Sequence, residues 1–458
     1  MHSVNIVYHD FLVSAGHCRS ISMLSNQIHA LFSLARHPHL GREEIVDFQN
    51  RHLRRIVMHA YKNIAYYRKL FDSIRLKPQD IRTVDDLSAI PITSKKDLQT
   101  VPLKEQVARG VNAGRLITHK TGGSTGEPMV VRRTWIEERL LQAFRRRAMH
   151  QFGQRVTDRI VKIFAFGAEP DNDNQLLQRS LQAIGVYRLA GVECRLPPEE
   201  IVRQVNRLNP DVVIGSPGVL QHLCELLGEE RGPLIRPRFV AVGGEVLTSL
   251  MRHQINQAFG APVFNMYGSY EFNLLAWECR ETGELHTCDD SAILEVLKDG
   301  RPSKEGEQGE VVGTTLHSFA MPFIRYRLDD IVTRGTDVCK CGKPFSTIRQ
   351  VQGRVVDYFL LPMGRVIHPW ELSDTIYTAP WIRKYRLVQE RVDKIVLQVV
   401  PMADAPEQEM NRIKDSVNKV LGGAVEFQIV VVPDIHWESG GKFRVYRSLV
   451  TSNGNSSL

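Results

Sequence analysis

Between residues 159 and 268, short apolar runs alternate with amphipathic stretches, and this alternation constrains the fold more than any other feature of the chain. The apolar runs are RIVKIFAF (159–166), DVVIGSP (211–217), RFVAVGG (238–244) and APVFNMYG (261–268). Most of them end in glycine or another turn residue, and helical patterns such as LQHLCELLGEE lie between them. Short apolar runs are typical of buried strands, and strands that alternate with helices form α/β sheets. The alternation therefore predicts an α/β core.

Regions with other patterns flank this core. Residues 22–105 are expected to be mostly helical, because apolar residues recur at three- and four-residue steps between Glu43 and Phe71. From 291 to 335, strand-like runs alternate with charged turns, and after Gly353 the order hairpin, helix, two strands, helix, strand predicts a small α+β unit. We expect three parts: a helical N-terminal region at 1–105, an α/β core at 106–352 and a small C-terminal domain at 353–458.

The composition limits the classes of partner. At 458 residues the chain is long enough for two or three structural units. Its 59 Lys and Arg residues are scattered and nearly matched by 51 acidic ones, and the densest basic run, Arg145-Arg146-Arg147, lies in a segment interpreted as a helix with one solvated face. We therefore expect no nucleic-acid partner. Without a secretory signal or an apolar stretch of 18 residues, and with seven cysteines, the chain is expected to be cytoplasmic and not inserted in a membrane.

A glycine-rich segment, THKTGGSTGEPMV (118–130), is the first candidate for chemistry. Glycines permit positive φ angles and close backbone approach, so that successive N–H groups can converge on phosphate oxygens. A P-loop would continue with lysine and a hydroxyl residue after the last glycine, whereas Glu127 and Pro128 follow here. The segment is thus either a phosphate loop of another kind or a surface turn.

Three further motifs follow along the chain. In NMYGSYEFNLL (265–275), an aromatic residue at a strand end could stack on a base, and Glu271 could hold Mg²⁺ beside a phosphate. Paired aspartates in FIRYRLDDIV suit the recognition of hydroxyl groups, and Lys442 in ESGGKFRVYRS could carry a point charge into a site. Each motif also has an ordinary structural interpretation: a core tyrosine with a solvated glutamate, a β-turn, and a solvated lysine.

The order of the motifs removes much of this ambiguity. TGGSTGEP, GGE (243–245), YGSxE, RYRxxD, GRxxD (353–357) and GGK, in this order, resemble the adenylate-forming enzyme superfamily of acyl-CoA synthetases, adenylation domains and luciferases. More closely, the chain resembles the phenylacetate–CoA ligase-like family, in its branch associated with capsular polysaccharide; the helical lead-in around HAYKNIAYYRKLF is also similar. The likeness runs from about 45 to 445. It implies the adenylate-forming fold, with a large N-terminal domain that has a helical lead-in and β-sheets, and a small, mobile C-terminal α+β domain.

The resemblance implies a role for each motif residue. The expected ATP-binding residues are Thr121, Gly122, Gly123, Ser124, Thr125 and Gly126 at the phosphates, Gly243, Gly244, Glu245, Tyr267, Gly268 and Ser269 around the adenine, and Asp330 and Arg354 at the ribose. The expected catalytic residues are Lys442, which would bridge the substrate carboxylate and the α-phosphate, and Glu271, which would coordinate Mg²⁺. Asp357 would be the hinge. Glu127 departs from the family pattern, in which lysine often follows the loop.

The implied function is the ATP- and Mg²⁺-dependent activation of a small-molecule carboxylic acid, aryl or arylacetic, as its acyl-adenylate. The acyl group would then pass to a thiol, either CoA or the phosphopantetheine of a carrier protein. Two alternatives remain: an amide or ester synthetase that transfers the acyl group to an amine or hydroxyl, and a non-catalytic nucleotide-binding scaffold. Phe164, Phe166 and residues 214–217 are apolar candidates for the acyl pocket.

A separate cysteine cluster predicts a metal site. Three thiols and an imidazole, from Cys279, His286, Cys339 and Cys341, form a set that suits tetrahedral Zn²⁺, and a site with four protein ligands is structural rather than catalytic. Cys288 is an alternative to His286 as the fourth ligand. Reduced structural cysteines without a metal are the other interpretation.

Overall fold

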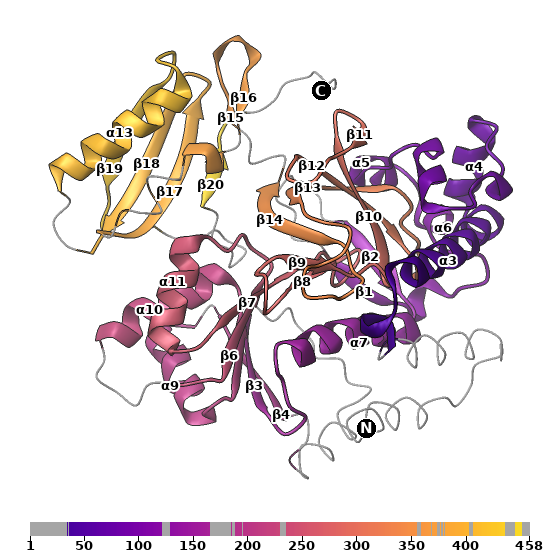
Figure 1. The fold of residues 1–458 in the computed structure, drawn as a ribbon, viewed down its shortest axis with the longest axis horizontal. Coiled ribbons are helices and arrows are strands. Elements are labelled where there is room, and N and C mark those ends of the chain that lie inside the picture. The colour runs from indigo at the N-terminus through magenta and orange to yellow at the C-terminus, as the bar shows by residue number, and fades with distance from the viewer. Residues whose placement is uncertain are drawn as a thin grey trace.

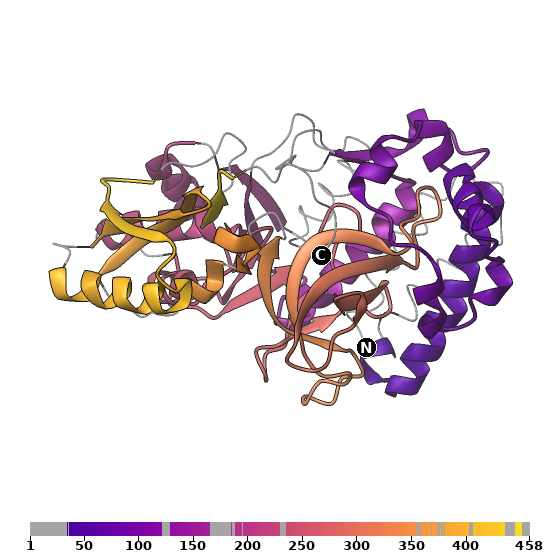
Figure 2. The same cartoon turned by 90° about the horizontal axis from the view of Figure 1, so that it is seen from above.

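The computed structural model describes residues 34, 36–120, 129–164, 185, 188–194, 196–229, 235–354, 359–367, 369–372, 376, 379, 381–402, 406–435 and 445–450. Helices of the N-terminal region lie at one end of the molecule and the C-terminal elements at the other, with a large sheet between them (Figures 1 and 2).

The N-terminal region is helical, as predicted. Its elements are η1 (His37–His39), α3 (Arg42–Asn63), α4 (Ala65–Ser73), η2 (Pro78–Asp80), η3 (Val84–Ala89), α5 (Lys95–Gln99), α6 (Leu103–Gln106) and η4 (Ala113–Arg115). Helix α3 buries Ile45, Leu53 and Ile56 on one face, which is the three- and four-residue spacing seen in the sequence. These side chains pack the helical region against the large sheet, since Ile293, which lies in a strand of that sheet, shares the cluster of Leu53 and Ile56.

A twelve-stranded sheet forms the core, in the order β11-β10-β12-β13-β14-β9-β8-β7-β6-β5-β3-β4. The strands are β3 (Arg159–Phe164), β4 (Arg188–Glu193), β5 (Val212–Gly215), β6 (Phe239–Gly243), β7 (Val263–Tyr267), β8 (Ala276–Glu278), β9 (Leu285–Thr287), β10 (Ala292–Lys298), β11 (Arg301–Pro302), β12 (Gln308–Thr315), β13 (Tyr326–Arg334) and β14 (Thr347–Arg354). Strands β3 to β7 are parallel to one another, and β7 to β14 pair in antiparallel fashion. The predicted α/β core and the predicted β-rich region after 291 are both confirmed, and they are halves of one sheet.

Helices cover both faces of the parallel half. On one face, α9 (Pro198–Leu208), α10 (Pro217–Glu229) and α11 (Ser249–Phe259) pack against Val161, Val213 and Val240 (Figure 1). On the other face, α7 (Trp135–Gln151) packs Ala148 and Met149 against the opposite side chains of the same strands. Side chains alternate between the faces of a strand, so both faces of these strands are largely apolar, as burial on both sides requires.

The basic run on α7 is partly buried. Arg147 has 9% of its surface exposed and forms a buried ion pair with Asp290, and Arg145 is half-buried. The helix itself is confirmed: Thr134 caps it by accepting a hydrogen bond from the Glu137 N–H, and the Glu137 carboxylate accepts one from the Thr134 N–H. The sequence pattern could not show this burial because the partner, Asp290, is far along the chain.

The C-terminal part forms a second sheet in the order β19-β18-β17-β20, beside a hairpin of β15 and β16. Its elements are β15 (Phe359–Leu360), η7 (Pro362–Gly364), β16 (Val366–Ile367), η8 (Pro369–Leu372), β17 (Ile382–Arg391), β18 (Lys394–Pro401), α13 (Glu407–Leu421), β19 (Glu426–Val431) and β20 (Tyr446–Ser448). The side-chain amides of Gln221 on α10 and Gln254 on α11 donate to the carbonyl of Arg383 at 3.2 and 3.1 Å. The hairpin, the strand pair and α13 agree with the predicted α+β unit. In the part of the chain that is described, no helix is both long and apolar enough to cross a bilayer.

Candidate active site

Two residues expected at different parts of the nucleotide touch each other. Tyr267, the last residue of β7, donates a hydrogen bond from its hydroxyl to Asp330 Oδ2 on β13 at 2.7 Å. The register of β13 and β14 places Arg354 directly opposite Asp330. The structure thus brings Tyr267, Asp330 and Arg354, which are distant in sequence, to one place on the sheet.

A tight turn after β7 carries the next expected residues. A Cβ on Gly268 would lie 2.1 Å from the carbonyl oxygen of Asn273, so the turn can close only on glycine. The Asn273 N–H donates to the Ser269 carbonyl at 2.8 Å, and the Phe272 N–H donates to Ser269 Oγ at 3.3 Å. Gly268 and Ser269 therefore shape the backbone at the end of β7.

Glu271 lies within this turn, with 8% of its surface exposed. Its Oε1 accepts a hydrogen bond from the Tyr326 hydroxyl at 3.2 Å. Burial, together with the negative charge of Glu271, raises the pKa of Tyr326 above its ordinary range, so that this hydroxyl remains a donor. A buried carboxylate held in this way offers hard oxygen ligands of the type that Mg²⁺ prefers.

The Gly243-Gly244-Glu245 motif ends β6, next to β7. A Cβ on Gly243 would lie 2.7 Å from the carbonyl oxygen of Met266, and Gly244 has a φ of +85°, so both positions favour glycine. Glu245 Oε2 accepts a hydrogen bond at 3.0 Å from the backbone N–H of Gly218, in the first turn of α10. A carboxylate at a helix N-terminus is stabilised by unpaired N–H groups and the helix dipole, so Glu245 links the motif to α10.

The expected phosphate loop connects β1 (Ile117–Lys120) and β2 (Val130–Arg133), which form an antiparallel pair. Thr121, Gly122, Gly123, Ser124, Thr125 and Gly126 themselves, with Glu127, lie outside the described residues, as do Asp357 and Lys442. These predictions stay predictions.

A charged network fixes the base of this hairpin. Glu138 Oε2 on α7 lies 3.0 Å from both Arg133 Nη1 and His119 Nε2, and Glu138 Oε1 accepts from Gln142 Nε2 at 2.8 Å. Burial alone would raise the pKa of Glu138, but these hydrogen bonds and the Arg133 charge lower it to about 2. Arg133 also donates to the carbonyl of Tyr270, so the network ties the hairpin to the turn that contains Glu271. No motif marks Arg133 or Glu138 in the sequence, because each acts through a contact that only the fold creates.

The four expected metal ligands come together. One ligand atom from each of Cys279, His286, Cys339 and Cys341 lies within 4.8 Å of the other three. His286 Nε2 is 3.2 Å from Cys341 Sγ. Burial, with the charges of Lys343 and Arg147, lowers the pKa of His286 to about 4, so the imidazole is neutral at physiological pH, the form that binds zinc. The chemistry of this set, three thiols and one neutral imidazole, fits tetrahedral Zn²⁺.

Cys288 is not part of this group. It is fully buried beside Arg147 and Asp290, and burial raises the pKa of its thiol well above the ordinary range. The structure therefore favours His286 over Cys288 as the fourth member.

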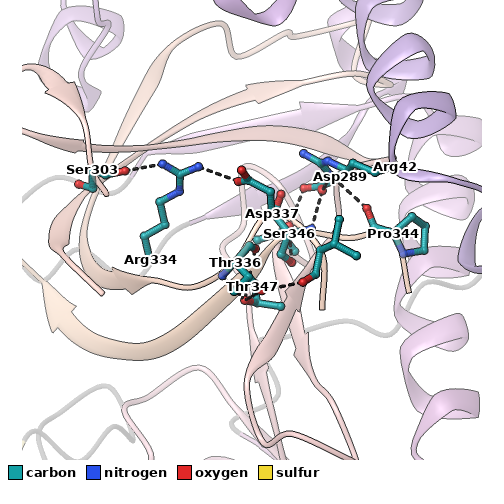
Figure 3. Close-up of polar contacts among 11 residues, drawn as sticks. Arg42, Asp289, Ser303, Arg334, Thr336, Asp337, Pro344, Ser346 and Thr347 are labelled. Atoms are coloured by element: carbon teal, nitrogen blue, oxygen red, sulfur yellow. Dashed lines mark hydrogen bonds and ion pairs between the residues drawn. The ribbon is translucent and has the colours of Figure 1, made fainter. Parts of the chain in front are cut away.

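Polar contacts anchor the loop that carries Cys339 and Cys341 between β13 and β14 (Figure 3). Arg42 at the start of α3 binds Asp289 and the carbonyl of Pro344, and the Ser346 N–H donates to Asp289 Oδ2 at 2.8 Å. At the base of the loop, the Thr336 N–H donates to Thr347 Oγ1 at 2.8 Å. These contacts connect the helical region, the end of β9 and the β13–β14 loop.

Comparisons with known proteins agree with this arrangement. A family model described as the CapK C-terminal domain matches residues 359–448. A phenylacetate–coenzyme A ligase from Thermus thermophilus is 27% identical over 373 residues, which cover 77% of this chain and 80% of that protein. The protein CapK of Staphylococcus aureus is 23% identical over 419 residues, 88% of each chain. A crystal structure of a 2-hydroxyisobutyryl-CoA ligase matches with a TM-score of 0.77 at 20% identity, over 91% of this chain and 92% of that one. The resemblance and the adenylate-forming fold are thereby confirmed.

Proposed function

Because the chain is a homologue of phenylacetate–CoA ligases and has the fold of adenylate-forming CoA ligases, we propose that it activates a carboxylic acid with ATP and transfers the acyl group to CoA. The observation that carries this proposal is the hydrogen bond between Tyr267 and Asp330, beside the buried Glu271. A scaffold without nucleotide chemistry has no need of these residues at one place.

In the proposed first step, the carboxylate oxygen of the acid attacks the α-phosphorus of ATP, and the bond to the β-phosphate oxygen breaks. Pyrophosphate leaves and the acyl-adenylate remains. Asp330 would accept hydrogen bonds from the ribose hydroxyls, held in orientation by Tyr267, and Gly268 would let the turn after β7 close tightly beside the nucleotide. Glu271 would hold Mg²⁺, which supplies positive charge to the phosphates when it is bound. Catalysis then consists of positioning and charge stabilisation.

In the proposed second step, the CoA thiolate attacks the acyl carbonyl, and AMP leaves with the electron pair of the broken acyl–oxygen bond.

Lys442 would act in the first step, where it would stabilise the charge that develops on the carboxylate and the α-phosphate. Removing a single donor that acts on a transition state of this kind lowers the rate by about 10²–10³-fold. Lys442→Ala is therefore expected to lose the first step and to keep ATP binding.

We also propose that Cys279, His286, Cys339 and Cys341 bind a structural Zn²⁺. Their convergence within 4.8 Å and the neutral imidazole support this assignment. With four protein ligands there is no open position for a substrate, so the metal would hold the β13–β14 loop to the core and take no part in the reaction.

Pyrophosphate release tests the proposed function. The protein is incubated with ATP, Mg²⁺ and a panel of carboxylic acids, with and without CoA. We expect acid-dependent release that CoA accelerates, together with its near-complete loss in Lys442→Ala. Absence of release with every acid, or equal release by Lys442→Ala, would contradict the proposal. Acceleration by an amine or a hydroxyl compound but not by CoA would make the protein an amide or ester synthetase instead.

A further inference from the structure

A lysine occupies an unusual position in the parallel sheet. Lys162 lies within β3, between β4 and β5, with Gly191 and Ile214 as its register partners. The residues two positions before and after it, Ile160 and Phe164, point to the same face and pack into the apolar cluster under α7. A strand buried on both faces normally carries apolar residues here, because an ammonium group is costly to remove from water.

The charges nearest to Lys162 have the same sign. Arg145 and Arg146 of α7 act on it electrostatically, and burial together with these two guanidinium groups lowers the pKa of Lys162 to about 8. Within the described part of the chain, the Lys162 ammonium forms no ion pair or hydrogen bond. Repulsion between cations in a half-buried place is unfavourable, and an anion bound among them would relieve it.

This group of cations borders the proposed active site. Arg145 Nε donates to Asn273 Oδ1 at 3.2 Å, and Asn273 closes the turn that contains Glu271. Lys162 is two residues before the carboxyl end of β3, and ligands of open α/β sheets bind outside the carboxyl ends of the strands. Lys162 and Arg145 therefore lie beside the proposed active site, near the edge of the sheet at which ligands bind.

We propose that Lys162 and Arg145 bind a second anionic group of the substrate, and that the acid is a dicarboxylic acid or another acid with an oxyanion remote from the activated carboxylate. The inference rests on the proposed function and replaces the neutral aryl or arylacetic acid expected from the family. A neutral acid would leave the Lys162 ammonium without a counter-charge, whereas a remote oxyanion would accept charge-assisted hydrogen bonds from Lys162 and Arg145.

Matched pairs of acids test this inference: phenylacetate with 4-carboxyphenylacetate, and hexanoate with adipate. The ratio of kcat/KM for the anionic member to that for its neutral partner is measured by pyrophosphate release. We expect the wild-type protein to favour the anionic member. Lys162→Met should lower the ratio by about 10- to 100-fold, because a hydrogen bond to a charged group contributes about 1.5–3 kcal/mol. Lys162→Arg should retain most of the preference for the anionic acid. Lys104→Met, which changes an exposed lysine of α6, should leave the ratio unchanged.

The pH dependence of the wild-type protein gives a second readout that needs no variant. Lys162 loses its charge near pH 8, so the ratio should fall between pH 7 and pH 9, while the second carboxylate of the substrate stays ionised. A flat profile, or a ratio that Lys162→Met does not change, would overturn the inference and leave the proposed function intact. No pyrophosphate release from either member of any pair would overturn the proposed function, and this inference with it.

Discussion

The buried ion pair between Arg147 and Asp290 allows a quantitative prediction. The Arg147 side chain is 9% exposed and the Asp290 side chain 0%. Arg147 Nη2 donates to Asp290 Oδ1 at 2.9 Å, and Arg147 Nη1 binds Asp290 Oδ2. His37 Nδ1 also lies 2.7 Å from Asp290 Oδ2. The Arg147 guanidinium also lies 5.1 Å from the ring centroids of Trp277 and Phe345. Asp290→Asn keeps the shape of the side chain but removes its charge, and it directs N–H groups at those of Arg147. An uncompensated buried charge of this kind costs about 3–5 kcal/mol.

The decrease in the free energy of unfolding is measured by urea unfolding. The transition is followed by tryptophan fluorescence, to which the buried Trp277 contributes. A decrease of about 3–5 kcal/mol is a large part of the 5–15 kcal/mol that typically stabilises a domain. Asp393→Asn is the matched control, since Asp393 forms an exposed pair with Arg391, and exposed pairs contribute little. Replacing both buried partners by Arg147→Met and Asp290→Leu should cost less than Asp290→Asn alone. Equal unfolding curves for Asp290→Asn and Asp393→Asn would refute the reasoning.

The same pair makes stability depend on pH in a defined direction. Burial alone would raise the pKa of Asp290, but the Arg147 charge and the His37 contact hold it below its ordinary value of 3.8. A carboxylate whose pKa is lower in the folded state stabilises the protein above its unfolded-state pKa and loses that contribution as the pH falls. The difference in stability between the wild-type protein and Asp290→Asn should therefore be full at pH 6 and shrink below about pH 4.

Three further predictions concern the site and the cysteine cluster. Tyr267→Phe removes the hydrogen bond to Asp330 and should raise KM for ATP about tenfold in steady-state kinetics; an unchanged KM would separate this pair from nucleotide binding. Gly268→Ala places a methyl group 2.1 Å from the Asn273 carbonyl oxygen, so kcat/KM for ATP should fall at least tenfold. Circular dichroism should show that the variant stays folded, and full activity would contradict the proposed role of this turn. Elemental analysis should find one zinc per chain in the wild-type protein and less than half as much in Cys341→Ser, together with a lower unfolding temperature; zinc-free wild-type protein would refute the metal site.

The strand–helix alternation predicted the parallel half of the sheet closely. RIVKIFAF contains β3, and RFVAVGG contains β6, because each run is mostly apolar and short enough for a buried strand. The sequence did not predict that the β-rich region after 291 joins the same sheet. That depends on the pairing of β14 with β9 and of β8 with β7, which are long-range contacts that no local pattern specifies.

Prediction of the candidate site had the same limit. Tyr267 and Asp330, which the motif order assigns to one nucleotide site, do touch each other, and Cys279, His286, Cys339 and Cys341, which the sequence suggests as metal ligands, do converge. The partners that hold these groups were missed, since Glu138 and Lys162 belong to no motif. Their importance arises only when α7 packs on the sheet and brings its arginines beside β3. Charge runs in a sequence carry no information on such burial.

Oxygen-18 labelling tests directly whether a carboxylate oxygen of the acid attacks the α-phosphorus of ATP. An acid that supports pyrophosphate release is labelled with oxygen-18 in its carboxylate and incubated with ATP, Mg²⁺ and CoA, and the phosphate-containing products are analysed by mass spectrometry. We predict one labelled oxygen in AMP and none in pyrophosphate, because the bridging oxygen of the acyl-adenylate stays with AMP when the thiol attacks. Label in orthophosphate, accompanied by ADP, would show attack on the γ-phosphorus and would contradict the account.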